Sequence, residues 1–410
     1  MILAPLAVGF AVAATAVATQ AGPLAGSLAG AAAQRGPSAV QPVAVFGDDD
    51  RVPLPDSKAA LTSSIGLIHE PGSQSTCTAF CVGDDVAATA GHCLFRTGGD
   101  RPPRLPGFTF RLNPKGAKSL TTRIAGAGHK AASQHVVAGT LKLRVKPPLN
   151  AASDWALVKL EEPICKGRAL ALSPQPAREL VALSTAQRVY QVSFHRDFGD
   201  WDLALGRPCA IRRSFGEADW RSISKDFTDA RDVILHTCDT GEASSGSPLL
   251  IDGPGGPEVI GISVGTYLQS RVLTQKGQVV HRYKARTLAN TGVSADAFRD
   301  ALDALQRADI VANLDDVRDL QRLLSAEGYA VGALDGLYGP NLNGAIRAFE
   351  RAEGRRETGL ATMQLLKRLA ARDAQRRGGE PRPLAPAAHI ETGALGAHAP
   401  RHDRLRDLAR

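Results

Sequence analysis

The stretch DVAATAGHCLF, residues 85–95, places His92 directly before Cys93 at the end of a run of small, β-prone apolar residues. A histidine in this setting can be a packed core residue, a metal ligand or the base of a catalytic site. His92 alone does not distinguish these three roles. The decision depends on the partners that the rest of the chain supplies.

Two later segments supply such partners. The segment SDWALVKL, residues 153–160, places Asp154 before an apolar run, and CDTGEASSGSPLL, residues 238–250, places Ser245 in a turn of small residues. A serine hydroxyl needs a base within hydrogen-bonding reach to act as a nucleophile, and that base needs a carboxylate to fix its tautomer. His92, Asp154 and Ser245 meet this requirement, although their order along the chain is weak evidence by itself.

The residues around these positions are more specific than their order. The segments TAGHC (residues 89–93), DWALVKL (residues 154–160) and SSGSP (residues 244–248) resemble the signatures of chymotrypsin-fold serine proteases, especially the bacterial branch that includes the glutamyl endopeptidases. The resemblance covers about residues 60–305. It implies that His92 is the catalytic base, Asp154 the acid that orients it and Ser245 the nucleophile, with no cofactor required.

The same resemblance assigns the oxyanion hole to the backbone amides of Ser245 and Ala243. The position of Ala243 is usually glycine, which accepts backbone angles that cost alanine about 1 kcal/mol. The sequence therefore leaves open how well this hole is formed. Ser244 stands where the digestive proteases carry an aspartate that pairs with a newly cut N-terminus, so we expect no activation by that route.

Substrate preference is less determined by the sequence. Asp239 lies six residues before Ser245, where trypsin-like enzymes carry the aspartate that receives Lys or Arg; alternatively, it only hydrogen-bonds local backbone. Ser263, Val264 and Gly265 match the stretch that lines the specificity pocket and pairs with the substrate backbone. Small or apolar side chains, admitted past Val264 and Gly265, remain an alternative. Ser263 is also expected, by resemblance, to support Asp154.

The six cysteines favour an oxidising compartment. The resemblance implies a disulfide between Cys77 and Cys93, which staples the histidine loop in this family. We further expect Cys209 to pair with Cys238, which leaves Cys81 for Cys165. Cys77 and Cys81 form a C-x3-C pattern without a second matching pair, so we expect no metal site.

Short apolar runs rich in β-formers alternate with turn residues between about residues 63 and 293. This pattern predicts a mainly β domain, and the resemblance makes it two six-stranded Greek-key β-barrels of the chymotrypsin-like fold. We place this protease domain at residues 58–308. A small three-helix domain is expected to follow it.

The segment at residues 312–370 resembles the three-helix peptidoglycan-binding domain found at the ends of cell-wall enzymes. The resemblance lies in aliphatic residues at helical spacing and in turns such as Asp335-Gly336 and Gly339-Pro340. Leu342 replaces the usual Thr and Glu350 the usual Gln. Retention of the fold is therefore expected more firmly than retention of binding, and a helical module without a ligand is the alternative.

Both ends of the chain differ from the middle. Residues 1–21 are apolar, with no Lys or Arg before Arg35, and read as a signal peptide or an uncleaved N-terminal anchor. Residues 22–57 are expected to form a disordered linker or prosegment, and residues 371–410 a disordered basic tail. The net charge of +8 is modest for 410 residues, and no nucleic-acid motif is present.

Together these features predict a serine endopeptidase that is secreted or periplasmic and associated with the cell wall. Its partners would be a protein or peptide substrate and peptidoglycan, with no nucleic acid and no membrane after signal cleavage. The alternative is a non-catalytic, protease-like scaffold that binds peptidoglycan and protein partners and has lost turnover through Ala243.

Overall fold

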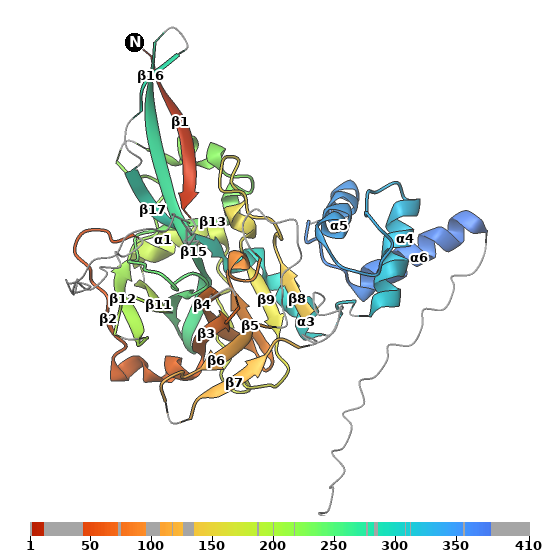
Figure 1. Cartoon of the computed structure of the whole chain (residues 1–410), viewed down its shortest axis with the longest axis horizontal. Helices are drawn as coiled ribbons and strands as arrows, with labels where there is room; N and C mark the ends of the chain where they lie inside the picture. Colours follow the sequence, from red (N-terminus) through yellow and green to blue (C-terminus); the bar gives the residue numbers. More distant parts are fainter. Residues whose placement is uncertain are drawn as a thin grey trace, which may run out of the picture.

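The protein is mainly β, with a group of helices at its C-terminal end (Figure 1). Its structure is a computed structural model. It describes the following residues: 2–11, 44–72, 75–95, 107–116, 118–125, 135–186, 188–199, 201–216, 218–275, 278–282, 286–307, 309–311, 313–355 and 357–378. The predicted fold class is confirmed: two antiparallel barrels precede a three-helix domain.

The first sheet has seven strands in the order β7-β6-β3-β4-β5-β9-β8. A bridge between Ile124 and Leu160 joins the ends of β7 and β9, so six of these strands close into a barrel and β8 extends the sheet. Its strands are β3 (Ile65–Glu70), β4 (Ser75–Gly83), β5 (Val86–Thr89), β6 (Thr109–Leu112), β7 (Leu120–Arg123), β8 (Val136–Ala138) and β9 (Ala156–Lys159).

The second sheet has ten strands, of which seven follow the order β13-β17-β15-β14-β11-β12-β2. A bridge between Ile211 and His236 joins the segment after β12 to β13, which closes the second six-stranded barrel. Strands β1, β10 and β16 pair with β15 outside this path. The strands are β1 (Ile2–Ala11), β2 (Val52–Pro53), β10 (Ala171–Leu172), β11 (Val189–Phe194), β12 (Leu203–Cys209), β13 (Val233–His236), β14 (Pro248–Gly253), β15 (Gly256–Gln275), β16 (Gln278–Arg282) and β17 (Arg286–Ser294).

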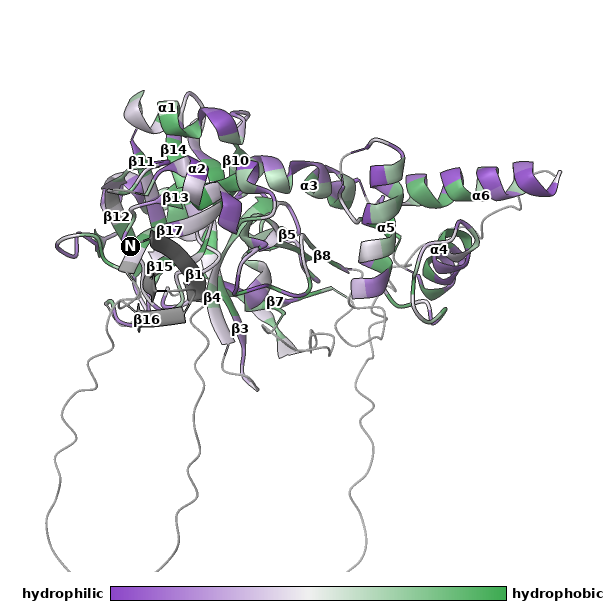
Figure 2. Cartoon of the chain, turned by 90° about the horizontal axis from the view of Figure 1, so that it is seen from above, coloured by the Kyte–Doolittle hydropathy of each residue, from purple (hydrophilic) through white to green (hydrophobic). Residues whose placement is uncertain are grey.

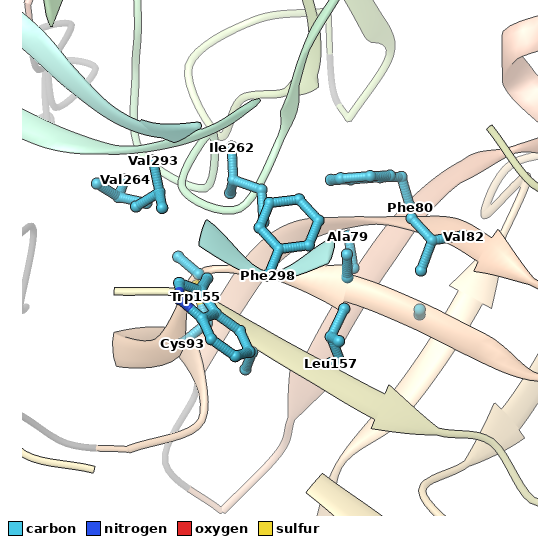
Figure 3. Close-up of a cluster of buried hydrophobic side chains, with 14 of the residues drawn as sticks. Ala79, Phe80, Val82, Cys93, Trp155, Leu157, Ile262, Val264, Val293 and Phe298 are labelled. Atoms are coloured by element: carbon cyan, nitrogen blue, oxygen red, sulfur yellow. The ribbon is translucent and has the colours of Figure 1, made fainter. Parts of the chain in front are cut away.

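One apolar core joins the two barrels (Figure 3). Trp155, which leads into β9, packs near Phe298 with their ring centroids 6.0 Å apart. Ile262 and Val264 of β15 belong to the same cluster. Because side chains on both barrels share this core, the barrels are held as one unit, and the loops that meet between them have fixed walls.

Short helices connect the strands. Helix α3 buries Ala301, Leu302 and Leu305 against the core, at the spacing expected for one face of a helix. The α-helices of this part are α1 (Leu180–Ala186), α2 (Trp220–Ile223) and α3 (Arg299–Gln306). The 3-10 turns are η1 (Asp56–Ser63), η2 (Gly91–Cys93), η5 (Ala151–Ser153), η6 (Ala177–Glu179), η7 (Ser224–Asp226), η8 (Ala230–Asp232) and η9 (Ala295–Ala297).

The C-terminal domain consists of α4 (Leu314–Ala326), α5 (Pro340–Ala352) and α6 (Met363–Arg377) around an apolar core of its own. The side chains of Asn313 and Thr362 cap the starts of α4 and α6, and Pro340 occupies the first turn of α5. Hydrophobic and hydrophilic residues alternate along α6 (Figure 2). Apolar residues of all three helices meet in the shared core.

The structure moves some of the expected boundaries. Residues 44–57, expected in a disordered linker or prosegment, belong to the second barrel, because Arg51 is buried and β2 pairs with β12. The expected tail starts later than residue 371, since α6 continues to Arg377. The expected signal or anchor segment enters the described structure as β1, which pairs with β15. Residues 12–43 and 379–410 lie outside the described residues.

Candidate active site

His92 and Asp154 are brought together by paired strand ends. Thr89 at the end of β5 pairs with Ala156 at the start of β9, so η2 and the turn η5 that precedes Asp154 lie side by side. Asp154 is fully buried, and one carboxylate oxygen accepts the His92 backbone N–H at 2.8 Å. The other oxygen lies 2.8 Å from His92 Nδ1. This contact places the proton on Nδ1 and leaves Nε2 as the basic nitrogen.

Ser245 lies in the loop of residues 238–247 between β13 and β14, here called the Ser245 loop. Thr78 of β4 holds this loop: its N–H donates to the carbonyl oxygens of Ala243 at 2.8 Å and Ser245 at 3.0 Å, and its hydroxyl donates to Ala243 at 2.8 Å. The Cys93 sulfur lies 3.9 Å from both His92 Nε2 and the Ser245 carbonyl oxygen. The three predicted triad residues are therefore neighbours. Across the described residues, no hydrogen bond joins the Ser245 hydroxyl to His92.

The backbone at Ala243 has φ +75°, in the left-handed region that favours glycine. The two bonds from Thr78 to its carbonyl hold it there. Within the described residues, neither the Ala243 N–H nor the Ser245 N–H has an acceptor. An alanine thus takes the conformation of the glycine usual at this position, and two amides remain free to bind an anion.

The neighbouring serines have other partners. The Ser244 hydroxyl donates to the Gly241 carbonyl at 2.7 Å, and Ser247 accepts a hydrogen bond from Gln191 at 2.6 Å. Both serines are buried, whereas Ser245 is half-buried. Ser245 is therefore the serine of this loop that a substrate could reach.

Residues 263–265 of β15 lie between the parts of β15 that pair with β14 and with β1 along the same edge. On that edge β14 pairs up to Ile262 and β1 pairs from Thr266 onward, while β17 occupies the opposite edge. The Val264 side chain is fully buried in the core, so it does not line a pocket for substrate. The described contact of the Ser263 hydroxyl is with His236 at 3.4 Å, and not with Asp154 as expected.

Asp239 is buried and binds backbone that is distant in sequence. Its two carboxylate oxygens accept the N–H groups of Phe46 at 2.8 Å and Asp50 at 3.1 Å. Next to it, Thr240 and Ala44 exchange two backbone hydrogen bonds, at 2.9 and 3.2 Å. Of the two sequence interpretations, the backbone-binding one agrees with this geometry, except that the backbone bound is the N-terminal segment and not the local turn.

A charged cluster lies beside Asp239. The buried Arg51 guanidinium donates to the carboxylates of Asp49, at 2.7 and 2.9 Å, and Asp197, at 2.9 and 3.1 Å. His195 Nδ1 accepts the Gly241 N–H at 3.1 Å, and its Nε2 lies 2.8 Å from the Ser193 hydroxyl. Burial, reinforced by the positive charge of Arg51, lowers the pKa of His195 to about 3. The imidazole is therefore neutral here and can accept the Gly241 N–H.

The three expected disulfides are confirmed. They join Cys77 to Cys93, Cys81 to Cys165 and Cys209 to Cys238. Ligand atoms of Cys77, Cys93 and His92 lie within 4.8 Å of one another, but both sulfurs are in the first disulfide. These sulfurs are therefore not available as thiolate ligands for a metal.

Sequence reasoning missed two features of the site. The first is Thr78, which holds the Ala243 carbonyl. The available signal was that Thr78 directly follows Cys77, the expected disulfide partner of Cys93 beside His92. The N-terminal segment of residues 44–53 was missed as well, because its contacts are distant in sequence. Arg51 binds Asp197, 146 residues later, and Phe46 binds Asp239, 193 residues later. No local pattern reports contacts at that separation.

The helical domain contacts the β-barrel domain close to Asp154. Arg347 of α5 donates to the Gly139 carbonyl at 2.6 Å, and the Gly139 N–H donates to Trp155 at 3.1 Å. A cavity of about 180 Å³ lies between the domains, and its walls include Ser153, Trp155 and Arg347. In the domain itself, Glu350 accepts the N–H groups of Thr358 and Gly359, at 2.6 and 2.8 Å. This side chain is occupied in holding a turn.

In the described part of the chain, no helix combines the length and apolar character required to cross a membrane. Residues 77–262 match the family described as "Trypsin-like peptidase domain", and residues 313–369 match "Putative peptidoglycan binding domain". No curated protein sequence matches the chain. Among solved structures, a Glu endopeptidase in complex with MPD is similar, with 16% sequence identity, a TM-score of 0.43, and coverage of 64% of this chain and 100% of that chain. The two family matches show that the chain carries a trypsin-like peptidase domain followed by a domain of the putative peptidoglycan-binding family.

Proposed function

We propose that the protein is a secreted serine endopeptidase that hydrolyses peptide bonds through Ser245, His92 and Asp154. One observation carries this proposal: the fully buried Asp154 carboxylate contacts both the backbone N–H and Nδ1 of His92 at 2.8 Å. A carboxylate held in this way fixes the tautomer and orientation of the ring and stabilises the imidazolium that forms during the reaction.

The proposed reaction begins when Ser245 Oγ attacks the scissile carbonyl carbon and its proton moves to His92 Nε2. The carbonyl oxygen becomes an oxyanion in the tetrahedral intermediate. When the C–N bond breaks, His92 returns the proton to the leaving amine, and an acyl-enzyme remains on Ser245. Water, deprotonated by His92, then releases the acid and restores the serine.

The oxyanion would be bound by the N–H groups of Ala243 and Ser245. The left-handed backbone at Ala243 and the absence of acceptors for both amides among the described residues support this role. Each such donor contributes about a hundredfold or more to the rate, since it meets charge that develops only in the transition state. Ala243 is therefore compatible with turnover as long as Thr78 holds its carbonyl.

The substrate backbone would pair with the edge of β15 at Val264 and Gly265. This edge lies between the parts of β15 that pair with β14 and β1. An extended peptide added there would run past Ser245 as one more strand.

We further propose that the helical domain binds peptidoglycan and holds the enzyme at the cell wall. The family match over residues 313–369 and the separate core of α4, α5 and α6 support this assignment. The disulfides agree with a secreted or periplasmic location, because such bonds persist in oxidising compartments.

A fluorophosphonate probe tests the proposed triad directly. The full chain is expected to take up one label, since phosphonylation needs a serine activated by His92 and a pocket that binds the developing oxyanion. Labelling should vanish in Ser245→Ala and in His92→Ala. The matched control is Ser244→Ala, which removes the neighbouring buried hydroxyl and should still be labelled. A wild-type chain that neither labels nor cleaves casein, even after limited proteolysis of its N-terminal residues, would favour the non-catalytic scaffold.

Sedimentation with purified peptidoglycan tests the second proposal. The Ser245→Ala chain should sediment at physiological salt, and a chain that ends after Arg307 should not. A chain that ends after Gly378 separates the helical domain from the basic tail and should still sediment. Loss of sedimentation in this last variant would assign wall binding to the tail instead.

A further inference from the structure

The N-terminal segment of residues 44–53, here called the arm, lies against the Ser245 loop and is tied to it at several points. Ala44 and Thr240 pair through two backbone hydrogen bonds, and Asp239 accepts two N–H groups of the arm. The carboxylate of Asp239 thus has a bonded donor on each of its oxygens. It is also only 3% exposed, so little of it is open to solvent or to a substrate.

The segment of residues 195–198 contacts the other face of the loop. The arm binds this segment as well, through Arg51 and Asp197. Gly241 donates to His195, and Glu242 accepts the Arg196 N–H at 2.9 Å. A Cβ atom at Gly241 would lie 2.5 Å from an Asp197 oxygen and 2.8 Å from Arg51 Nη1. The loop backbone is therefore packed directly against the Arg51–Asp197 ion pair. This packing leaves no room for a larger residue in place of Gly241.

Arg51 is the link between the arm and this second segment. Its side chain is 2% exposed, and it forms a bidentate pair with Asp197, whose side chain is 7% exposed. Bidentate pairs of this kind fix geometry as well as charge. Two residues after Gly241 comes Ala243, whose N–H must point at the oxyanion. A loop tied on both faces up to Glu242 has little freedom to turn that amide away.

We propose that the arm is the device that positions the Ser245 loop, that Asp239 is a positioning residue which anchors the arm, and that Asp239 does not receive a basic substrate side chain. The proposal rests on the proposed protease function and adds to it a positioning element and the exclusion of Asp239 as the residue that selects the substrate. The active enzyme must retain residues 44–53, so a maturation cut that leaves it active lies before Ala44.

Kinetics on peptides that differ only in the residue before the scissile bond separate the two roles of Asp239. In Asp239→Asn, the amide NH2 meets one of the two arm N–H groups, so the loop loses an anchor. We expect kcat to fall by about ten- to a hundredfold, as for a displaced catalytic loop, while KM stays nearly unchanged. The factor should be the same whether Lys, Arg, Glu, Ala or Leu precedes the scissile bond. A loss confined to the Lys and Arg substrates would overturn the proposal. Asp48→Asn is the matched control, because Asp48 is exposed on the same arm.

Hydrogen exchange measures the anchor without requiring turnover. In the Ser245→Ala chain, the hydrogen-bonded amides of residues 44–53 and 238–247, such as those of Phe46, Asp50 and Thr240, should exchange slowly. Adding Asp239→Asn should speed exchange in both segments together, and adding Asp48→Asn should change neither. Unchanged exchange in the arm after Asp239→Asn would refute the anchor. If the exchange is coupled in this way but the wild-type chain, which keeps Ser245, never labels with the fluorophosphonate, the proposed protease function is overturned and the anchor stands.

Discussion

The two halves of the candidate site are held in different ways. His92 and Asp154 belong to the first barrel and lie at the ends of paired strands, so the regular β5–β9 ladder brings them together. Ser245 belongs to the second barrel and lies in an irregular loop. That loop is fixed by Thr78, by the Cys209–Cys238 disulfide and by the arm.

The geometry of the first half follows from the strands that carry it. The geometry of the second half depends on segments that are distant in the sequence. The ladder positions His92 through contacts that are local within one sheet. The Ser245 loop needs Asp239 to find Phe46, which lies 193 residues earlier. We therefore expect disturbances of the first half to alter chemistry alone, and disturbances of the second half to alter the shape of the loop as well.

The largest effect is expected for Asp154→Asn. The amide cannot favour the Nδ1–H tautomer of His92, so kcat should fall by about 10⁴-fold while the fold is kept. The measurement is peptide hydrolysis, with thermal unfolding as the control for structure. A fall below about tenfold would mean that Asp154 does not orient His92.

The disulfides give the next test of the contrast. Loop-closure entropy predicts that removing Cys81–Cys165, with a sequence separation of 84, lowers the free energy of unfolding by about 4.5 kcal/mol. Removing Cys209–Cys238, with a sequence separation of 29, should lower it by about 3.5 kcal/mol. Double Cys→Ser variants are compared by urea unfolding and by activity. Although it costs less stability, the second variant should lose activity by about tenfold or more, because Cys238 adjoins the Ser245 loop.

If activity of the folded protein falls equally in both disulfide variants, the contrast between the halves is wrong. The comparison is made at a temperature and a urea concentration at which both variants remain folded. Wild-type protein treated in the same way provides the reference.

Ala243→Val is expected to have a smaller effect in free energy than the loss of either disulfide, about 2.7 kcal/mol in the activation barrier. A β-branched residue is strained at φ +75°, so the backbone should shift and withdraw one oxyanion donor. We expect kcat to fall by about a hundredfold with KM little changed. Ala243→Gly should retain wild-type kcat within about twofold, because glycine takes the same conformation. A large gain in Ala243→Gly would show instead that the present hole is badly formed.

The smallest effect concerns pH and falls on the second barrel. Burial lowers the pKa of His195 and of His236 to about 3, so each is neutral in the folded protein and gains a proton more readily when unfolded. Their contribution to stability is complete above about pH 6.5 and is lost as the pH falls toward 3. At pH 5 each histidine should cost about 2 kcal/mol in the free energy of unfolding.

His195→Gln isolates this contribution from the carboxylates that titrate in the same range. Between pH 7 and pH 5, the difference in unfolding free energy between wild type and variant should narrow by about 2 kcal/mol. A constant difference would mean that His195 is not held neutral.

Local motifs were sufficient to point to the three residues that the structure brings together, in both halves of the candidate site. His92, Asp154 and Ser245 each lie in a short segment whose small residues and neighbouring strands report their surroundings. The disulfide pairing depended on the family resemblance, which assigned Cys77 to Cys93, because six cysteines alone allow many pairings. Sequence reasoning was weakest where a contact spans the chain, as between Arg51 and Asp197, because the Ala-, Gly- and Pro-rich start carries no period that would indicate order.

Side-chain direction was a second limit. Val264 was expected to border the specificity pocket, but its side chain lies in the core, since β15 is irregular between Ser263 and Gly265. A register shift of one residue sends a side chain to the opposite face of a strand. No feature of the SVG segment reports that shift.

The connection between the two domains sets how far the proposed enzyme could work from its anchor. Residues 307–313 separate α3 from α4, and this stretch would span at most about 25 Å if fully extended. It is not free to extend, because Val311 donates to Ala361 at 2.8 Å and Met363 donates to Asp309 at 2.7 Å. A molecule fixed to the wall through its helices would have no tether with which to search the surrounding space. Its reach would be roughly its own diameter, so it would cut proteins that share the wall surface and spare those that diffuse past at a greater distance.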